Sequence, residues 1–235
     1  MNCIVTAGPA FEPLDEVRRL TNFSTGRLGT ELANFLTARG HTVTLLIGEG
    51  STWPGARQAR VVTVFSSAKD LHDRLKSLSR KKTDAIFHAA AVSDFAFGKM
   101  FARTPAGHLR PLAPSKKIPT RRGSLLVELV PAPKIISHLR EWFPQARIIG
   151  WKFEAEGGRA DALRAARKQI ADRATDACVA NGPAYGRGFA LVTAEGSVHI
   201  PDRARLYAAL AETMHGRARH SVRAVVRGRS TARTE

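Results

Sequence analysis

An asparagine, a serine and two glycines stand close together in the segment Asn22-Phe23-Ser24-Thr25-Gly26-Arg27-Leu28-Gly29. A hydrophobic run over residues 3–7, which ends at Gly8, precedes this segment. A strand followed by a polar, glycine-rich loop and a helix start can bind phosphate, because backbone N–H groups there point at the anion and the helix dipole favours negative charge. The spacing is neither the dinucleotide G-x-G-x-x-G nor a Walker A loop. The segment therefore predicts an anion pocket of another type.

Asn22 and Ser24 have two possible roles in this segment. Either side chain can cap the helix that follows, which is a purely structural role. The amide of Asn22 can instead donate an N–H group to a reacting carbonyl oxygen.

Small residues dominate a second block, Ala89-Ala90-Ala91-Val92-Ser93-Asp94-Phe95, which follows an apolar segment predicted as a buried strand. Small side chains let a planar ligand or a phosphate approach the backbone closely. Asp94, placed directly after them, can hold a metal ion or a ribose hydroxyl. The structural alternative is a tight strand–helix turn that Asp94 caps.

Two further candidates are Lys117 and Trp151. Lys117 follows Lys116 in a basic segment and can meet a phosphate as a point charge, or it can belong to a solvated loop. Trp151 ends another predicted strand and can stack on a base, worth roughly 1–3 kcal/mol by analogy with base–aromatic stacking. Packing in the core is the alternative for Trp151.

Several classes of protein are excluded or disfavoured. No run of about 18 apolar residues is present, which argues against a transmembrane helix. The strand-like start predicts no signal peptide. Cys3 and Cys178 both fall in predicted strands, so we expect buried thiols in a reducing compartment, the cytoplasm. The histidines show no zinc-ligand spacing, and no G-x-S-x-G motif is present.

The net charge of +17 is concentrated in two segments. Residues 99–122 hold seven lysines and arginines and no acid, and residues 216–235 hold six arginines and one acid. Nucleic-acid binding is one interpretation of such charge. A solvated tail plus a loop that handles an anionic substrate is favoured, because no nucleic-acid-binding motif accompanies the charge.

Periodicity and turn residues predict alternating strands and helices, hence a doubly wound, Rossmann-like α/β fold with a mostly parallel sheet covered by helices on both faces. We expect one domain over residues 1–215, with a flap at about 96–124, a small β-hairpin near the C-terminus, and a disordered basic tail at 216–235. Strands are predicted at 3–7, 41–47, 60–65, 84–90, 147–152, 176–180, 189–193 and 197–200, and helices at 26–39, 68–78, within 131–142, 159–174 and 201–215.

Taken in order, these blocks resemble the phosphopantothenoylcysteine synthetase family. The family block T-A-G-G-T-x-E-P-[IL]-D-x-V-R is matched by residues 6–18, and N-x-S-[ST]-G-[KR]-x-G by residues 22–29. A-A-A-V-[AS]-D-[FY] is matched by residues 89–95, and K-I by residues 117–118. The proline loop, G-F-x-x-E and D-x-x-x-A-N correspond to residues 133–136, 150–154 and 176–181.

The resemblance implies phosphopantothenate–cysteine ligase activity in coenzyme A biosynthesis. The carboxylate of 4′-phosphopantothenate would attack the α-phosphate of CTP or ATP, and the amine of L-cysteine would then attack the acyl-nucleotide. The resemblance also implies Mg²⁺, no flavin in this chain, a separate flavin-dependent decarboxylase, and a homodimer with the flap and a sheet extension at the interface. Neither a membrane nor a nucleic acid is an expected partner.

The same resemblance implies roles for individual residues. Asn22 would hold the acyl carbonyl and assist the cysteine step, Lys117 would close onto the triphosphate, and Arg18 would orient phosphopantothenate. Ser24 and Gly26 would complete the phosphopantothenate site, and Asp94 is a possible Mg²⁺ ligand. The nucleotide would contact Gly8, His88, Ala90, Ala91, Asp94, Lys117, Pro133, Lys134, Ile135, Ile136, Trp151, Gln169 and Arg173.

This chain departs from the family pattern at several positions, among them Pro119 and Thr120 in the reduced K-I-K-K run and Gly182 where an aspartate is usual. Family members often have a second glycine in place of Pro9, a phenylalanine in place of Trp151, and lysines in place of Gln169 and Arg173. The choice between CTP and ATP is therefore left open. Two other functions also stay open: a degenerate member that binds nucleotide or nucleic acid without ligase activity, and a Rossmann-type oxidoreductase, which the missing G-x-G-x-x-G disfavours.

Overall fold

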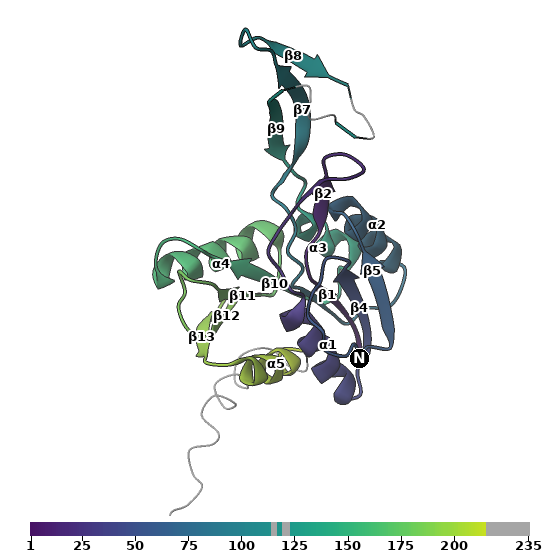
Figure 1. Cartoon of the computed structure of the whole chain (residues 1–235). Coiled ribbons are helices and arrows are strands. Elements are labelled where there is room, and N and C mark those ends of the chain that lie inside the picture. Colours follow the sequence, from purple (N-terminus) through teal and green to yellow (C-terminus); the bar gives the residue numbers. More distant parts are fainter. Residues whose placement is uncertain (114–116, 119–122, 215–235) are drawn as a thin grey trace, which may run out of the picture.

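An eight-stranded sheet lies at the centre of the chain, as the computed structural model in Figure 1 shows. The structure describes residues 1–113, 117–118 and 123–214, so the tail predicted at 216–235 lies outside the described residues. The strand order is β13-β12-β11-β10-β6-β1-β4-β5. The strands span β1 Asn2–Ala7, β4 Thr42–Gly48, β5 Val61–Phe65, β6 Ala85–His88, β10 Arg147–Phe153, β11 Ala177–Asn181, β12 Phe189–Thr193 and β13 Gly196–Ile200.

The sheet is parallel from β5 through β11, and only the hairpin β12–β13 is antiparallel. The side chains of β6 are buried on both faces, as expected for a central parallel strand covered by helices. Helices α1 (Arg27–Ala38) and α5 (Arg203–Glu212) pack on one face. Helices α2 (Ala68–Leu78), α3 (Leu139–Trp142) and α4 (Arg159–Arg173) pack on the other. The predicted doubly wound fold and its C-terminal hairpin are confirmed.

The direction in which the chain adds strands reverses between β1 and β6. The chain proceeds from β1 outward to β4 and β5, then returns to β6 and proceeds the other way to β10 and β11. In open α/β sheets, ligands bind in the crevice at the carboxyl ends of the strands where this reversal occurs. The loops after β1 and β6 are therefore the loops that position a site.

A three-stranded antiparallel arm projects from the body between β6 and β10 (Figure 1). It consists of β7 (Phe95–Arg103), β8 (Leu109–Leu112) and β9 (Leu125–Pro131), and it includes the described part of the excursion predicted at 96–124. The N–H of Ala132 donates to the carbonyl of Asp94 at 2.9 Å, which closes the base of the arm. Pro131 ends β9, so the helix predicted within 131–142 begins later, as the 3₁₀ turn η2 (Ile135–Ser137) followed by α3.

A short hairpin, β2 (Phe11–Pro13) and β3 (Arg19–Thr21), occupies the loop between β1 and α1. Its strands have only three residues each, too few for the alternating pattern by which strands are found in a sequence. The hairpin points toward the arm, and its second strand leads directly to Asn22 (Figure 1). None of the described helices is long and apolar enough to cross a bilayer.

Candidate functional site

A cavity of about 570 Å³ opens at the carboxyl ends of β6, β10 and β11, beside the start of α1. Its position is the reversal point of the sheet, where a ligand site is expected. The lining residues are Asn22, Phe23, Ser24, Leu28, His88, Ala89, Ala90, Ala91, Val92, Ser93, Asp94, Lys134, Ile135, Ile136, Trp151, Lys152, Phe153, Gln169 and Asn181.

Most of the site residues predicted from the sequence meet at this cavity. They come from separate parts of the chain: the loop before α1, the turn after β6, the turn before α3, the end of β10, and α4. The predicted residues that line the cavity are Asn22, Ser24, His88, Ala90, Ala91, Asp94, Lys134, Ile135, Ile136, Trp151 and Gln169. The predicted residues Gly8, Arg18, Gly26, Lys117, Pro133 and Arg173 are not among its described lining residues.

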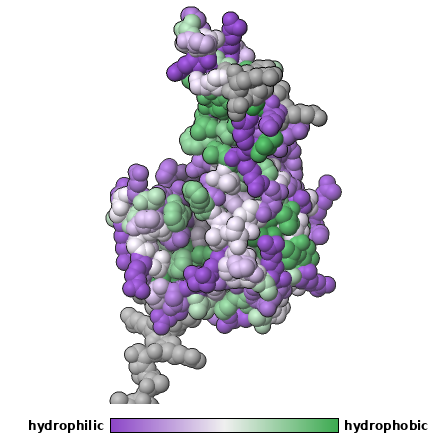
Figure 2. All heavy atoms as spheres, in the orientation of Figure 1, coloured by the Kyte–Doolittle hydropathy of each residue, from purple (hydrophilic) through white to green (hydrophobic). Residues whose placement is uncertain are grey.

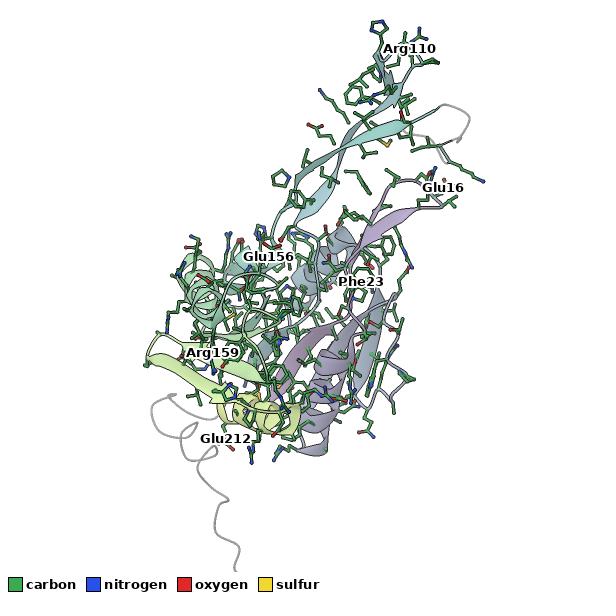
Figure 3. The ribbon with its side chains drawn as sticks, turned by 60° about the vertical axis from the view of Figure 1, so that its left-hand side comes forward. Glu16, Phe23, Arg110, Glu156, Arg159 and Glu212 are labelled. Carbon is green, nitrogen blue, oxygen red and sulfur yellow. The ribbon has the colours of Figure 1, made fainter. Side chains whose placement is uncertain are left out.

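Asn22 and Ser24 do not cap α1. The N-cap of that helix is Gly26, with φ 76°, and it is Oγ1 of Thr25 that accepts the N–H of the first helical residue at 3.3 Å. The N–H of Ser24 instead donates to the carbonyl of Asn22 at 3.0 Å, so the two residues form a tight turn on the cavity wall. The capping interpretation is thus wrong, and both side chains are available to a ligand. Phe23 between them is fully exposed and projects from the body (Figure 3).

Gly8 and Gly26 are required for packing. Both have positive φ, and a Cβ at Gly8 would lie 1.9 Å from Oγ of Ser51. A Cβ at Gly26 would lie 2.6 Å from the same oxygen. The loop after β4 therefore presses against both glycines. Their conformation and this contact account for glycine at each position, with or without a bound anion.

Pro9 lies in an extension of β1. The N–H of Ala10 donates to the carbonyl of Ala91 and the N–H of Ala91 donates to the carbonyl of Gly8, both at 2.9 Å. Pro9 itself forms a parallel bridge with Ala91. Proline lacks an N–H, but this pairing draws its donors from the neighbouring residues. The loop after β1 therefore serves to hold the alanine turn in place.

The alanine turn after β6 is also fixed from beneath by a buried threonine. Oγ1 of Thr6 accepts the N–H of Ala90 at 3.1 Å and contacts Nδ1 of His88 at 3.0 Å. Burial lowers the pKa of His88 from 6.5 to about 4, so its imidazole is neutral at pH 7. A neutral imidazole on the cavity floor can hydrogen-bond to a ligand without adding charge.

Asp94 lies at the mouth of the cavity. Its carboxylate is largely exposed and accepts a hydrogen bond from Nζ of Lys134 at 2.9 Å. The next residue begins β7, so the alternative role of Asp94 as a helix cap is excluded. Within the described ranges, no three His, Cys, Asp or Glu residues cluster in a way that could hold a metal ion. Asp94 fits Mg²⁺ only as a single carboxylate ligand to an ion that substrate phosphates also hold.

Trp151, Asn181 and Gln169 form the wall on the side of β10 and β11. The ring of Trp151 packs against the core and also lines the cavity, so the predicted core packing does not exclude contact with a ligand. Nε1 of Trp151 and Oδ1 of Asn181 are buried and have no hydrogen-bond partner among the described residues. Nε2 of Gln169 donates to Sγ of Cys178 at 3.2 Å. Two unpaired polar atoms in a cavity wall are suited to bind a ligand.

Sequence reasoning missed part of the lining. Asn181 ends a predicted strand within a matched family block, and its position at a strand end was the signal that could have identified it. The other lining residues that were missed are mostly apolar or exposed. No local sequence pattern gives them an individual role in a site, because only the fold brings them together. The lining residues to which no individual role was assigned are Phe23, Leu28, Ala89, Val92, Ser93, Lys152, Phe153 and Asn181, several of which belong to blocks that were expected near a ligand.

Burial raises the pKa of the Cys178 thiol to about 12 and that of Cys3 to about 11. Both cysteines are free and buried, as expected from the sequence. A thiol with such a raised pKa is not a nucleophile at neutral pH.

The chain matches one protein family and is similar to several curated proteins. Residues 1–222 match the family model of the DNA/pantothenate metabolism flavoprotein C-terminal domain. The coenzyme A biosynthesis bifunctional protein CoaBC of Thermococcus kodakarensis is 34% identical over 181 residues, which are 76% of this chain and 40% of that protein. The protein of the same name from Bacillus subtilis is 30% identical over 187 residues, or 79% of this chain and 41% of that protein. The chain thus spans about two fifths of these curated relatives.

Two solved structures share the fold. The DNA/pantothenate metabolism flavoprotein of Streptococcus pneumoniae superposes with a TM-score of 0.80 at 23% identity, covering 91% of this chain and 98% of that one. A Cab2 mutant in complex with phosphopantothenate-cysteine superposes with a TM-score of 0.68 at 20% identity, covering 91% and 87%. Together with the family model, these similarities show that the chain belongs to the DNA/pantothenate metabolism flavoprotein C-terminal domain family, the phosphopantothenoylcysteine synthetases that its sequence blocks resemble.

Proposed function

We propose that this protein is a phosphopantothenate–cysteine ligase. The observation that carries the proposal is the cavity at the sheet reversal, which gathers Asn22, the alanine turn, Asp94 and the turn at Lys134 from separate sequence blocks. The names of the relatives support a role in coenzyme A biosynthesis, and a protein of the same fold has been solved with phosphopantothenate-cysteine.

The first step joins the acyl substrate to the nucleotide. A carboxylate oxygen of 4′-phosphopantothenate attacks the α-phosphate of CTP or ATP, and pyrophosphate leaves. Ala90 and Ala91 present backbone without bulky side chains to the nucleotide, and Asp94 is placed to accept a ribose hydroxyl. Ile135, Ile136 and Trp151 supply apolar surface for the ribose and base.

The second step forms the amide. The cysteine amine attacks the acyl carbonyl, the nucleoside monophosphate leaves, and the amine releases a proton. The amide of Asn22 is placed on the cavity wall, where an N–H donor can stabilise the oxygen on which negative charge develops. An acyl-nucleotide is an anhydride that water would hydrolyse, so this step must proceed in a site that excludes water.

Mg²⁺ would arrive with the triphosphate and neutralise part of its charge. Asp94 is the side chain that would hold the ion, as an alternative to binding the ribose hydroxyl. The side chains of Lys134 and Lys152 add positive charge to the cavity wall, and this charge would attract the remaining phosphates of the nucleotide.

A homodimer formed through the arm completes the proposal, with a separate flavin-dependent decarboxylase as the next enzyme and the cytoplasm as its location. Phe95 on β7 and Leu129 on β9 support the dimer. Both are nearly half exposed and lie on the same face of the arm, because Phe97 is directly opposite Leu129. Hydrophobic side chains gather where the arm meets the body (Figure 2). An exposed apolar patch of this kind is typical of an interface.

The decisive experiment is a nucleotide panel. Purified protein, 4′-phosphopantothenate and Mg²⁺ are incubated with CTP, ATP, GTP or UTP, with and without L-cysteine, and pyrophosphate and the amide product are measured. We expect pyrophosphate with CTP, ATP or both, and the amide only when cysteine is present. Asn22→Ala should let the acyl-nucleotide accumulate, whereas Lys117→Ala should slow its formation.

Gln58→Ala serves as the control, because Gln58 lies on the surface near the far end of α1, where its backbone N–H, which the substitution keeps, bonds to Asn34. Nucleotide binding without pyrophosphate in any mixture would contradict the ligase and favour a binding protein of the same fold.

A further inference from the structure

The tip of the β2–β3 hairpin is organised around the carboxylate of Asp15. Oδ1 of Asp15 accepts the backbone N–H groups of Val17 at 2.9 Å and Arg18 at 2.8 Å. Oδ2 accepts Nε of Arg18 at 3.1 Å and forms an ion pair with its Nη2. The side chain of Asp15 is completely buried, and the Arg18 guanidinium holds the pKa of its carboxyl far below the usual range. Asp15 is thus ionised at every pH at which the protein would work.

The same two side chains hold the backbone of Ile118, a hundred residues away. The N–H of Ile118 donates to Oδ2 of Asp15 at 3.2 Å, and Nη2 of Arg18 donates to the carbonyl of Ile118 at 2.8 Å. The side chain of Ile118 is 3% exposed, so this residue is anchored on both its polar and its apolar sides. We call this set of contacts the Asp15–Arg18 clamp.

The clamp connects two residues to which chemistry is assigned. Lys117 directly precedes Ile118 and is exposed. At the other end of the hairpin, β3 stops at Thr21, whose Oγ1 donates to the carbonyl of Ala10 at 3.0 Å, and Asn22 follows. Figure 3 shows Glu16 at the hairpin tip, on the side facing the arm. The hairpin therefore connects the backbone that carries Lys117, at its tip, to the backbone that leads to Asn22, at its base.

We propose that Asp15 and Arg18 are positioning residues that fix Lys117 relative to the catalytic cavity by clamping the backbone of Ile118. This inference rests on the proposed ligase reaction, and it changes the expectation for Arg18: its guanidinium binds Asp15 and the Ile118 carbonyl within this chain, so its effect on the reaction passes through Lys117. Nε and Nη2 of Arg18 are engaged by Asp15 and the Ile118 carbonyl, so of its five N–H donors only the two on Nη1 remain for a substrate.

The test is a double-mutant cycle on pyrophosphate formation. Asp15→Asn keeps an acceptor oxygen but removes the charge that holds Arg18, and we expect kcat for pyrophosphate formation to fall by about tenfold or more, because small displacements of a catalytic group are costly. Lys117→Ala lowers the same rate. In the Lys117→Ala background, Asp15→Asn should change the rate by no more than about twofold, since the two residues act as one unit.

Glu16→Gln is the matched control, because Glu16 is an exposed acid at the same tip. Arg18→Lys is the second variant. Lysine keeps the positive charge near Asp15, but it has no planar group that can reach both Asp15 and the Ile118 carbonyl. We therefore expect a loss in kcat that is smaller than the loss in Asp15→Asn. Thermal unfolding of each variant shows whether it is folded, and the cycle is read only from folded variants.

A second measurement is independent of activity. Hydrogen exchange of the Ile118 amide, followed by NMR on the full chain, should accelerate by about tenfold in Asp15→Asn and not in Glu16→Gln, since one hydrogen bond is lost. Unchanged exchange would show that the clamp does not form. Faster exchange with fully additive rate losses in the cycle would overturn the positioning role. A wild-type protein that makes no pyrophosphate refutes the ligase proposal instead, and the exchange result still decides whether the clamp exists.

Discussion

Thr6 shows how one buried hydroxyl can organise a ligand site. It is completely buried on β1 and holds both the N–H of Ala90 and the ring of His88. Thr6→Val preserves the shape of the side chain but leaves two buried polar groups without a partner. We expect a loss of about 1–3 kcal/mol in the free energy of unfolding, measured by urea denaturation. Thr44→Val, on the neighbouring strand β4, is the control and should change stability by much less.

His88 predicts a specific dependence of stability on pH. Its folded pKa of about 4 lies below its ordinary value of 6.5, so the unfolded chain takes up a proton first as the pH falls. The stabilising contribution is fully present above pH 6.5 and is lost as the pH drops toward 4, by up to about 3 kcal/mol. Urea denaturation at several pH values should show a shallower decline for His88→Gln than for wild type. Parallel curves would contradict the assignment.

At the residue scale, sequence reasoning found the cavity residues that stand next to small or polar neighbours in a recognisable block. Asn22, Ala90 and Asp94 are of this kind. It could not locate Lys117 relative to them, because that distance depends on the hairpin tip at Asp15, whose strands are too short to be predicted. The fold determines which residues line the same cavity. The sequence blocks show only that these residues occur in one chain.

At the scale of the elements, α1 packs closely against β1 through a glycine. A Cβ on Gly29 would lie 2.6 Å from Cβ of Ala7 and 3.0 Å from the carbonyl oxygen of Thr6. Gly29→Ala must therefore push the helix away from the strand, at a cost of about 1–3 kcal/mol that outweighs the gain in helix propensity. Thermal unfolding should show the loss. Gly158→Ala, at the N-cap of α4, would meet only Oδ2 of Asp161 at 3.8 Å, an ordinary contact, so it should cost less than Gly29→Ala, with the loss of a preferred cap residue as its main cost.

The strands and helices of the body were predictable from the sequence, because buried parallel strands have continuous apolar runs and helices have apolar residues along one face. The cap of α2 is an example: Ser67 was expected there, and its Oγ accepts the N–H of Asp70. The arm strands were not predicted, since their residues are only half-buried or exposed and charged side chains such as Lys99, Arg110 and Glu128 interrupt their apolar runs. Their pairing depends on two segments more than twenty residues apart, which local periodicity does not report.

At the scale of the whole molecule, the arm is the expected dimer interface. Leu129→Glu places a charge among the exposed apolar side chains of β9 and should convert the dimer to a monomer in sedimentation velocity. Val61→Glu, at a similarly exposed position on the edge strand β5, should leave the dimer intact. Dissociation by the change on β5 alone would place the interface at that edge of the sheet.

The closed base of the arm has a consequence for how the protein can change over evolution. The arm leaves the body at Asp94 and returns at Ala132, and these two residues are hydrogen-bonded to each other. The arm strands between them can lengthen, shorten or be rebuilt without moving β6 or β10, provided that Ile118 keeps its contact with the β2–β3 hairpin and so holds Lys117 in place, because closing a loop costs little more as the loop grows. The outer part of the arm is in effect an exchangeable module, so relatives with the same cavity can acquire different assembly partners at this one junction.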